Sequence, residues 1–227
     1  MDYLKIEQSS AHRLIVECQT RLLELIWERN NLPKQGRILD VGPGKGLYAR
    51  LFRQWGLQVS CMDIDSSLRD FYTGLGCDFQ QADLRTGKLP YNDGSLDLIW
   101  CSHVIEHLHN PVEFVMECKR ILRVGGYLIL RTPDLKRVGF DFWHDPTHVQ
   151  PFIRLSLKKV LVVNGFSVVQ CSNCELPDVR GLHRIRAHRW WPSLLFKGTN
   201  LIAVGRKDKS ASESDSPSND PVSPMPK

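Results

Sequence analysis

The sequence predicts an α/β fold: a doubly wound, seven-stranded and mostly parallel sheet with an antiparallel last strand. Two observations carry this prediction. Short apolar runs alternate with helical patterns along most of the chain, as a parallel sheet with right-handed crossovers requires. In addition, the first apolar run, 37–41, leads into a loop with three alternate glycines, and a helical pattern follows at once.

Length and composition agree with one well-buried domain. The chain has 227 residues, 42% of them hydrophobic and 24% charged, and its formal net charge is +5. No apolar run approaches the roughly 20 residues of a membrane-spanning helix. The N-terminus also lacks the basic and apolar regions of a signal peptide. We therefore expect a cytoplasmic protein.

The chain divides into three predicted parts. Residues 1–34 form an N-terminal helical cap, whose amphipathic helix over about 9–30 is expected to cover the sheet edge or the mouth of the cofactor cleft. The main domain spans 35–206. Residues 207–227 are rich in Ser, Pro and Asp with almost no apolar side chains, so they are predicted to be a disordered tail.

Within the main domain, strands and helices alternate. Further helices are expected over 66–72, from Asn110 to the glycine pair at 125–126, and over 156–163. The run at 96–101 is nearly all apolar, which is typical of a central parallel strand. The predicted strands are 37–41, 57–62, 78–82, 96–101, 127–131, 166–170 and 199–204.

The loop after the first strand has the features of a nucleoside site. Glycines permit positive φ angles and let the backbone approach a ligand closely. A dinucleotide fingerprint starting at Gly42 would need a small residue at position 47, which is Leu47. The pattern is instead G-x-G-x-G, ending at Gly46, with Asp40 two residues ahead. The next strand ends at Asp63, where a carboxylate can accept both hydroxyls of a ribose.

This pattern resembles motif I of the class I S-adenosylmethionine-dependent methyltransferases, and the resemblance covers roughly 35–206. Residues 97–102 look like motif IV of that family. Residues 104–108 match the "LEH" signature of its small-molecule branch, here called type 11/type 23-like. Residues 122–126 resemble its "LRPGG" turn, with Val124 in place of the usual Pro.

The resemblance implies S-adenosylmethionine as the cofactor and assigns three acids. Asp40 would orient the glycine turn, Asp63 would fix the ribose, and Asp83 would bind the adenine amino group. The alternative for each acid is a strand-end residue that only caps a helix. The expected cofactor-binding residues are Asp40, Gly42, Pro43, Gly44, Gly46, Asp63, Ile64, Asp83, Leu84 and Ser102.

Candidate catalytic residues follow the fourth and fifth strands. Methyl transfer needs a general base only when the nucleophile must lose a proton, as a hydroxyl does. His148, with Asp145 to orient it, lies in a run that resembles a "DPTH-x-x-PF" signature of some bacterial methyltransferases. His103 directly follows Ser102 and is expected to face the substrate. The alternative is that His148 and Asp145 only brace their loop.

Two further features bear on partners. Six basic residues and no acid lie from position 180 to position 206, and in a predicted insertion at 178–197 two adjacent tryptophans follow closely spaced arginines. This segment favours an anionic acceptor or peripheral membrane contact through 180–197; the alternative is a hairpin packed on the domain. No metal site is predicted, because Cys171 and Cys174 have no second pair to complete one.

The leading predicted function is methyl transfer from S-adenosylmethionine to a small-molecule or glycan- or lipid-linked acceptor, at oxygen. One alternative is an RNA or protein methyltransferase, although nucleic acid is disfavoured because no RNA-binding module accompanies the domain. Another is a non-catalytic subunit that binds S-adenosylmethionine and regulates a partner.

Overall fold

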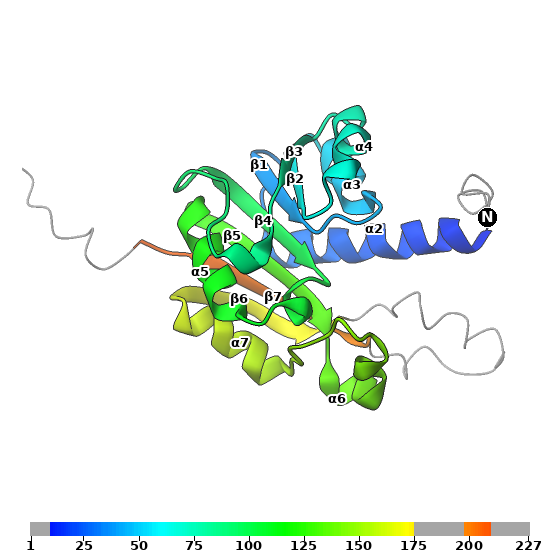
Figure 1. Ribbon diagram of the computed structural model, residues 1–227, viewed down its shortest axis with the longest axis vertical. Helices are drawn as coiled ribbons and strands as arrows, with labels where there is room; N and C mark the ends of the chain where they lie inside the picture. Colours follow the sequence, from blue (N-terminus) through cyan, green and yellow to red (C-terminus); the bar gives the residue numbers. More distant parts are fainter. Residues whose placement is uncertain (1–9, 175–197, 210–227) are drawn as a thin grey trace, which may run out of the picture.

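A computed structural model describes residues 10–174 and 198–209 of the chain. The predicted basic insertion and nearly all of the predicted tail therefore lie outside the described residues. Figure 1 shows one sheet with helices on both of its faces.

The sheet has seven strands in the order β3-β2-β1-β4-β5-β7-β6. From β3 through β5 each strand runs parallel to its neighbour, whereas β7 is antiparallel to both β5 and β6. This order confirms the predicted fold class, including the antiparallel last strand. The strands are β1 (Arg37–Val41), β2 (Gln58–Asp63), β3 (Asp78–Gln81), β4 (Leu96–Ser102), β5 (Leu122–Pro133), β6 (Phe166–Asn173) and β7 (Asn200–Lys207).

Apart from α6, which was not predicted, the α-helices lie where the periodicity predicts them, with small shifts at their ends. The α-helices are α2 (Ser10–Asn30), α3 (Leu47–Gln54), α4 (Arg69–Gly74), α5 (Pro111–Ile121), α6 (Leu135–Val138) and α7 (Arg154–Val163). Short 3₁₀ turns are η1 (Ser66–Leu68), η2 (Leu84–Thr86), η3 (Ile105–His107) and η4 (Gly139–His144).

One boundary differs from the prediction. The helix that begins at Asn110 was expected to run to the glycine pair, but α5 ends at Ile121 and β5 begins at Leu122. Leu122 already pairs with Leu96 of β4, and a register shift follows between Leu96 and Leu98. The glycine pair therefore lies within an irregular part of β5. There the pairing with β4 favours an extended backbone over a last turn of α5.

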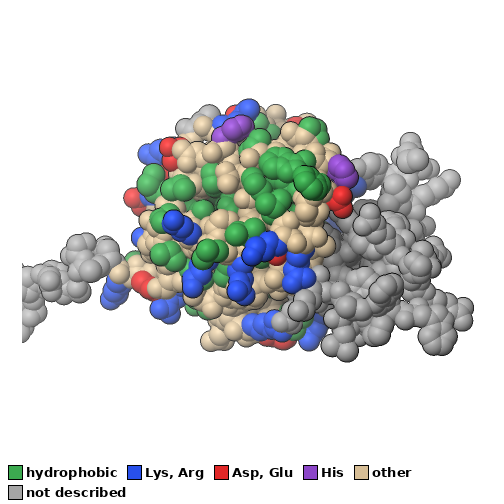
Figure 2. All heavy atoms as spheres, turned by 90° about the horizontal axis from the view of Figure 1, so that it is seen from below, with side chains coloured by type: hydrophobic (Ala, Val, Ile, Leu, Met, Phe, Trp, Pro, Cys, Tyr) green, Lys and Arg blue, Asp and Glu red, His purple; other side chains and the backbone are tan. Residues whose placement is uncertain are grey.

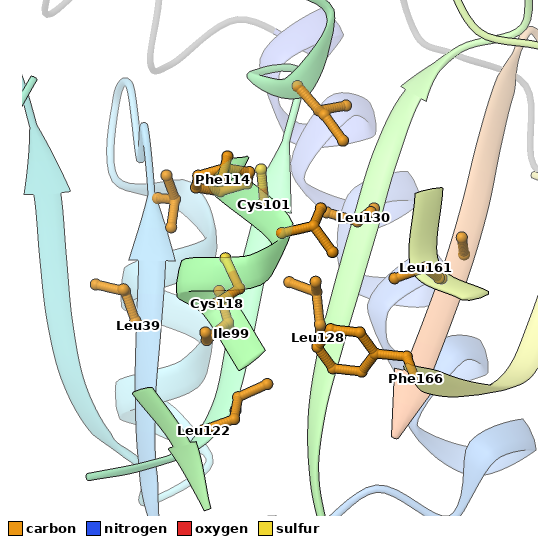
Figure 3. Close-up of a cluster of buried hydrophobic side chains, with 14 of the residues drawn as sticks. Leu39, Ile99, Cys101, Phe114, Cys118, Leu122, Leu128, Leu130, Leu161 and Phe166 are labelled. Atoms are coloured by element: carbon orange, nitrogen blue, oxygen red, sulfur yellow. The ribbon is translucent and has the colours of Figure 1, made fainter. Parts of the chain in front are cut away.

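Successive side chains of each strand point to opposite faces, so the sheet carries two separate cores. On one face, Leu39 and Ile99 pack with residues of α5 and α7, among them Phe114 and Leu161. Figure 3 shows this cluster between the strands and the two helices. On the other face, Ile38 belongs to a second cluster formed with α2, α3 and α4.

The second half of helix α2 packs on one face of the sheet, and the expected cover of the sheet edge or of the cofactor cleft stays a prediction. Its side chains Leu23 and Trp27 are almost fully buried in the second core, and the Trp27 and Trp100 rings lie 6.3 Å apart. At its end, Asn30 Nδ2 donates a hydrogen bond to Gln170 Oε1 of β6 at 2.7 Å. The apolar stripe of α2 is wide enough to bury against the strands, which places the helix there.

Figure 2 views the molecule from below the orientation of Figure 1 and shows hydrophobic side chains in patches beside lysines and arginines. The outer side of α7 contributes to the exposed apolar surface, through Leu155, Val162 and Val163. Among the described residues, none of the helices combines the length and the hydrophobicity needed to cross a membrane.

Candidate functional site

The loop between β1 and α3 has an unusual backbone. Gly42, Gly44 and Gly46 have φ angles of 61°, 57° and 72°, in the left-handed region that other residues rarely adopt. The Gly42 N–H donates to the carbonyl of Met62 in β2 at 2.9 Å, and Gly46 N–H donates to the carbonyl of Pro43 at 2.9 Å. The loop is thus a closed turn that is fixed to the neighbouring strand.

Of these three glycines, only Gly44 faces open space. A Cβ at Gly42 would lie 2.5 Å from Val104 Cγ2, and one at Gly46 would lie 3.0 Å from the Phe71 ring. A Cβ at Gly44 would meet nothing within 4 Å. The Gly44 carbonyl accepts a hydrogen bond from the Tyr72 hydroxyl at 2.5 Å, which holds the loop in place. A ligand can therefore approach the backbone closely at Gly44.

Asp40 lies beneath this loop and is only 1% exposed. Its carboxylate accepts a hydrogen bond from the Ala49 N–H in the first turn of α3, while Oδ2 has no partner among the described residues. Burial raises the pKa of Asp40 well above its ordinary value, against the opposing effect of the Ala49 bond. The Asp40 carboxylate therefore contacts the first turn of α3, which directly follows the glycine loop, and its role toward the cofactor stays a prediction.

Asp63 ends β2, next to the glycine loop. One carboxylate oxygen, Oδ1, accepts the Asp65 N–H at 3.1 Å, and Oδ2 accepts from no donor among the described residues. Ile64, which follows Asp63, is 55% exposed. A free carboxylate oxygen beside an exposed apolar side chain suits a ribose and its attached base.

Asp83 is already paired with an arginine. Both of its carboxylate oxygens accept hydrogen bonds from the Arg85 guanidinium, at distances of 2.7–3.1 Å. The side-chain and backbone bonds from Arg85 lower the pKa of Asp83 to about 2. Asp83 also caps η2, while Leu84 is partly buried and packs against the first core. An adenine amino group would have to share this carboxylate with Arg85.

At the end of β4, His103 adopts a strained backbone, with a φ of 58°. Its Nδ1 lies 3.1 Å from Oε1 of Glu106, whose other oxygen accepts the Thr132 hydroxyl at 2.9 Å. Glu106 is fully buried. Burial raises the pKa of Glu106, but the hydrogen bonds from His103 and Thr132 bring it below its ordinary value. An ionised carboxylate therefore orients His103.

His148 is held differently from the expectation. Its Nδ1 lies 2.7 Å from the carbonyl oxygen of Phe142, so that carbonyl orients the ring. Asp145 Oδ2 lies 3.9 Å from His148 Nε2, within ion-pair range but beyond hydrogen-bond distance. Asp145 Oδ1 instead accepts the backbone N–H of Thr147 at 2.9 Å and its hydroxyl at 2.5 Å. An aspartate carboxylate readily accepts a hydrogen bond from the backbone N–H two residues ahead. Here the Asp145 carboxylate forms this turn with Thr147 and does not bond to His148.

The sequence analysis missed Arg131, near the end of β5. The residue is 4% exposed, and its Nη1 makes only long contacts, 3.3 Å to the Tyr48 hydroxyl and 3.4 Å to Ser102 Oγ. Its Nε has no partner, and no carboxylate pairs with it, within the part of the chain that the structure describes. The available signal was a lone arginine in an otherwise apolar strand, 127–131.

These groups meet at one edge of the sheet, since the parallel strands β1, β2, β4 and β5 all end there. The side chain of Val104, between His103 and Glu106, packs directly on Gly42. The glycine loop and the His103–Glu106 pair are therefore neighbours. In open α/β sheets this edge is where ligands bind.

The strand order, the glycine loop and the acid at the end of β2 are those of a class I S-adenosylmethionine-dependent methyltransferase domain. The family described as "Methyltransferase domain", of type 11, matches residues 39–130. Residues 39–130 thus form a methyltransferase domain of the type 11 branch, which confirms the resemblance found in the sequence.

Curated relatives agree with this assignment. A probable S-adenosylmethionine-dependent methyltransferase of Mycolicibacterium smegmatis is 31% identical over 153 residues, which cover 64% of this chain and 58% of the relative. A ubiquinone biosynthesis O-methyltransferase of Xanthomonas oryzae is 32% identical over 101 residues, 42% of each chain. The match thus spans little more than half the length of the mycobacterial relative.

Solved structures show the same fold. The structure of a SAM-dependent methyltransferase from Archaeoglobus fulgidus has a TM-score of 0.63 and 22% sequence identity, and the match covers 91% of this chain and all of that one. At this identity the likeness shows the fold alone.

The cofactor that the family implies, S-adenosylmethionine, fits the residues present. The open position at Gly44 admits a ligand against the backbone, and Asp63 Oδ2 can accept a ribose hydroxyl. Arg131 offers a buried cation for the carboxylate of the methionine end. When bound, this cofactor supplies a methyl group that is already activated on a sulfonium sulfur.

Proposed function

We propose that this chain transfers a methyl group from S-adenosylmethionine to a hydroxyl group of a small-molecule or glycan-type acceptor. The observation that carries the proposal is the adjacency, through Val104 on Gly42, of an open glycine loop and a histidine held by a buried carboxylate. The first feature serves the donor and the second serves a nucleophile that must lose a proton.

The residues toward the donor are distributed over several strands. Gly44 lets the donor approach the backbone, Asp63 would accept the ribose hydroxyls, and Ile64 would cover one side of the base. Arg131 would pair with the donor's carboxylate. Fixing donor and acceptor in line is the main task, since proximity and orientation alone can supply about 7–11 kcal/mol of the barrier.

The general base is proposed to be His103. Its Nδ1 is bonded to the ionised Glu106, which would stabilise the imidazole once it has taken a proton from the acceptor hydroxyl. His148, the base favoured by the sequence, has only a carbonyl partner at Nδ1 and no hydrogen bond to Asp145. A buried carboxylate stabilises a protonated imidazole better than a carbonyl does, which favours His103.

Relatives support transfer to oxygen. The Xanthomonas oryzae protein is named an O-methyltransferase, and its similarity to this chain includes 101 aligned residues. The proposal also includes two roles for the basic segment 180–197: it would hold an anionic acceptor, and it would contact a membrane surface. That segment lies outside the described residues.

The test is a donor-binding measurement followed by a transfer assay on the full chain. Calorimetry should give one S-adenosylmethionine per chain, and a donor labelled in its methyl group should label a hydroxyl acceptor from a panel of sugars, nucleotide sugars, lipid-linked glycans and phenols. If only RNA or protein were labelled, the proposed class of acceptor would be wrong, and the chain would be an RNA or protein methyltransferase. Tight donor binding without transfer to any acceptor would favour the regulatory subunit and contradict the proposal.

A further inference from the structure

Three side chains at the edge of the site converge on one point. One potential ligand atom from each of Glu106, His107 and His148 lies within 4.8 Å of the other two. We propose that these three residues bind a divalent transition-metal ion. The sequence analysis predicted no metal site, because Cys171 and Cys174 have no second pair to complete one, and it did not bring these three residues together.

The hydrogen bonds of His107 leave one nitrogen free for a metal. The Thr147 hydroxyl donates its proton to Asp145 Oδ1 at 2.5 Å, so toward His107 Nδ1, 2.9 Å away, that oxygen acts as an acceptor. The Thr147 carbonyl, 3.1 Å from the same Nδ1, is also only an acceptor. Nδ1 therefore carries the proton, and Nε2 presents a lone pair.

His148 reaches the same state by a different contact. The carbonyl of Phe142, 2.7 Å from Nδ1, can only accept, so the proton is again on Nδ1 and the lone pair is on Nε2. The rings of His107 and His148 lie 4.8 Å apart between centroids. Metal-binding histidines commonly donate their other N–H to a backbone carbonyl, which fixes the tautomer and orients the ring.

Glu106 supplies the negative charge. Its carboxylate is fully buried, and hydrogen bonds from His103 and Thr132 hold one oxygen each. Each carboxylate oxygen has two lone pairs, so both bonds can persist while one oxygen binds a metal. Each of the three proposed ligands is thus held by hydrogen bonds to groups that would not contact the ion, as the outer-shell partners of a metal site do.

The backbone brings the two halves of the site together. The carbonyl oxygen of Glu106 accepts hydrogen bonds from the N–H groups of both Val149 and Gln150, each at 2.9 Å. These bonds tie η3 to the segment that carries His148. The three ligands are therefore assembled by the fold before any ion binds.

The donor set indicates which ions fit. Two imidazole nitrogens and one carboxylate suit Zn²⁺, Mn²⁺, Fe²⁺ or Co²⁺, whereas Ca²⁺ and Mg²⁺ prefer oxygen ligands throughout. Three protein ligands also leave coordination positions open. If the proposed methyl transfer is correct, an open position beside His103 would hold an acceptor oxygen and lower the pKa of its hydroxyl. This second step rests on the proposed function, but metal binding does not.

The experiment uses the full chain, freed of metal with a chelator and titrated with Co²⁺ and Mn²⁺. We expect one equivalent to bind, with Co²⁺ giving the visible absorption of nitrogen and oxygen ligands. His107→Gln, His148→Gln and Glu106→Gln should each weaken binding by at least about tenfold, since even outer-shell changes cost 10–100-fold. The matched controls His109→Gln, at an exposed site next to η3, and His144→Gln, whose side chain is 80% exposed, should bind like the wild type.

Folding and donor binding are measured on the same samples. Circular dichroism and thermal melting identify any variant that fails to fold, and metal-dependent stabilisation of the wild type then provides the second readout. No uptake by the wild type, equal weakening in the controls, or thiolate absorption from Cys171 and Cys174 would overturn the site. Because S-adenosylmethionine affinity is measured separately, failure of the metal site and failure of the proposed function are distinguishable.

Discussion

The imidazole of His103 and the carboxylate of Glu106 form a hydrogen-bonded pair, with Nδ1 3.1 Å from Oε1, just beyond the end of β4. Glu106 is fully buried, whereas the side chain of His103 is 28% exposed. One partner therefore supplies a charge from inside the domain, and the other is partly exposed at the edge where ligands bind. The pair has the arrangement of a general base and the group that orients it.

Replacing His103 tests this role. His103→Ala should lower the rate of transfer to a hydroxyl acceptor by about 10²–10⁴-fold, the usual contribution of a positioned base. Affinity for S-adenosylmethionine should stay within about twofold, because the side chain is not placed at the donor. The rate is measured with labelled donor, and His109→Ala is the matched control. A variant that retains the wild-type rate would remove His103 from the mechanism and leave His148 as the candidate.

Asp40 gives a pH-dependent prediction. Its pKa is raised in the folded protein, so the folded state disfavours the charged form. The wild type should therefore lose stability as pH rises from the ordinary value of 3.8 through the folded pKa. Asp40→Asn keeps an oxygen for the Ala49 N–H but cannot ionise.

At neutral pH and without donor, Asp40→Asn should consequently melt at a higher temperature than the wild type. The difference should shrink as the pH falls toward 4, where about half of the Asp40 carboxyl groups in the unfolded chain are protonated. Melting curves at a series of pH values measure this. A variant that is less stable than the wild type at neutral pH would show that Asp40 has a favourable partner.

A comparison of substitutions at Gly44 and Gly56 separates the effect of backbone strain from that of ligand contact. Gly44→Ala and Gly56→Ala each place a Cβ at a positive φ, 57° and 89°, and each Cβ meets nothing within 4 Å. Both should lose about 1–2 kcal/mol of stability. Only Gly44→Ala should weaken binding of S-adenosylmethionine, because only that Cβ fills the space of the donor. Equal affinities by calorimetry would place the donor elsewhere.

Arg131 is expected to bind the donor's carboxylate. Arg131→Met should reduce donor affinity by about 10–100-fold, the scale of hydrogen bonds to charged groups. The melting temperature without donor should not fall, since a buried guanidinium that lacks an acidic partner among the described residues contributes little to stability. Unchanged donor affinity in this variant would exclude the contact.

The sequence predicted the parts of the site that local patterns determine. The glycine loop, the position of Asp63 and the alternation of strands with helices depend on spacings within a few residues or within one strand–helix unit. The surroundings of His107 could not be predicted, because they depend on hydrogen bonds from the N–H groups of Val149 and Gln150 to the Glu106 carbonyl, about forty residues away in the sequence. The position of α2 could not be predicted either, because an amphipathic stripe shows that a helix is buried but not against which surface.

Binding of S-adenosylmethionine to the wild type and to Asp63→Ala tests the central claim most directly. We expect one donor per chain by calorimetry, and a loss of at least about 1–3 kcal/mol of binding free energy in Asp63→Ala. Asp70→Ala, at an exposed position of α4, should bind like the wild type. A wild type that does not bind the donor, or an Asp63→Ala variant that binds it equally well, would contradict the account.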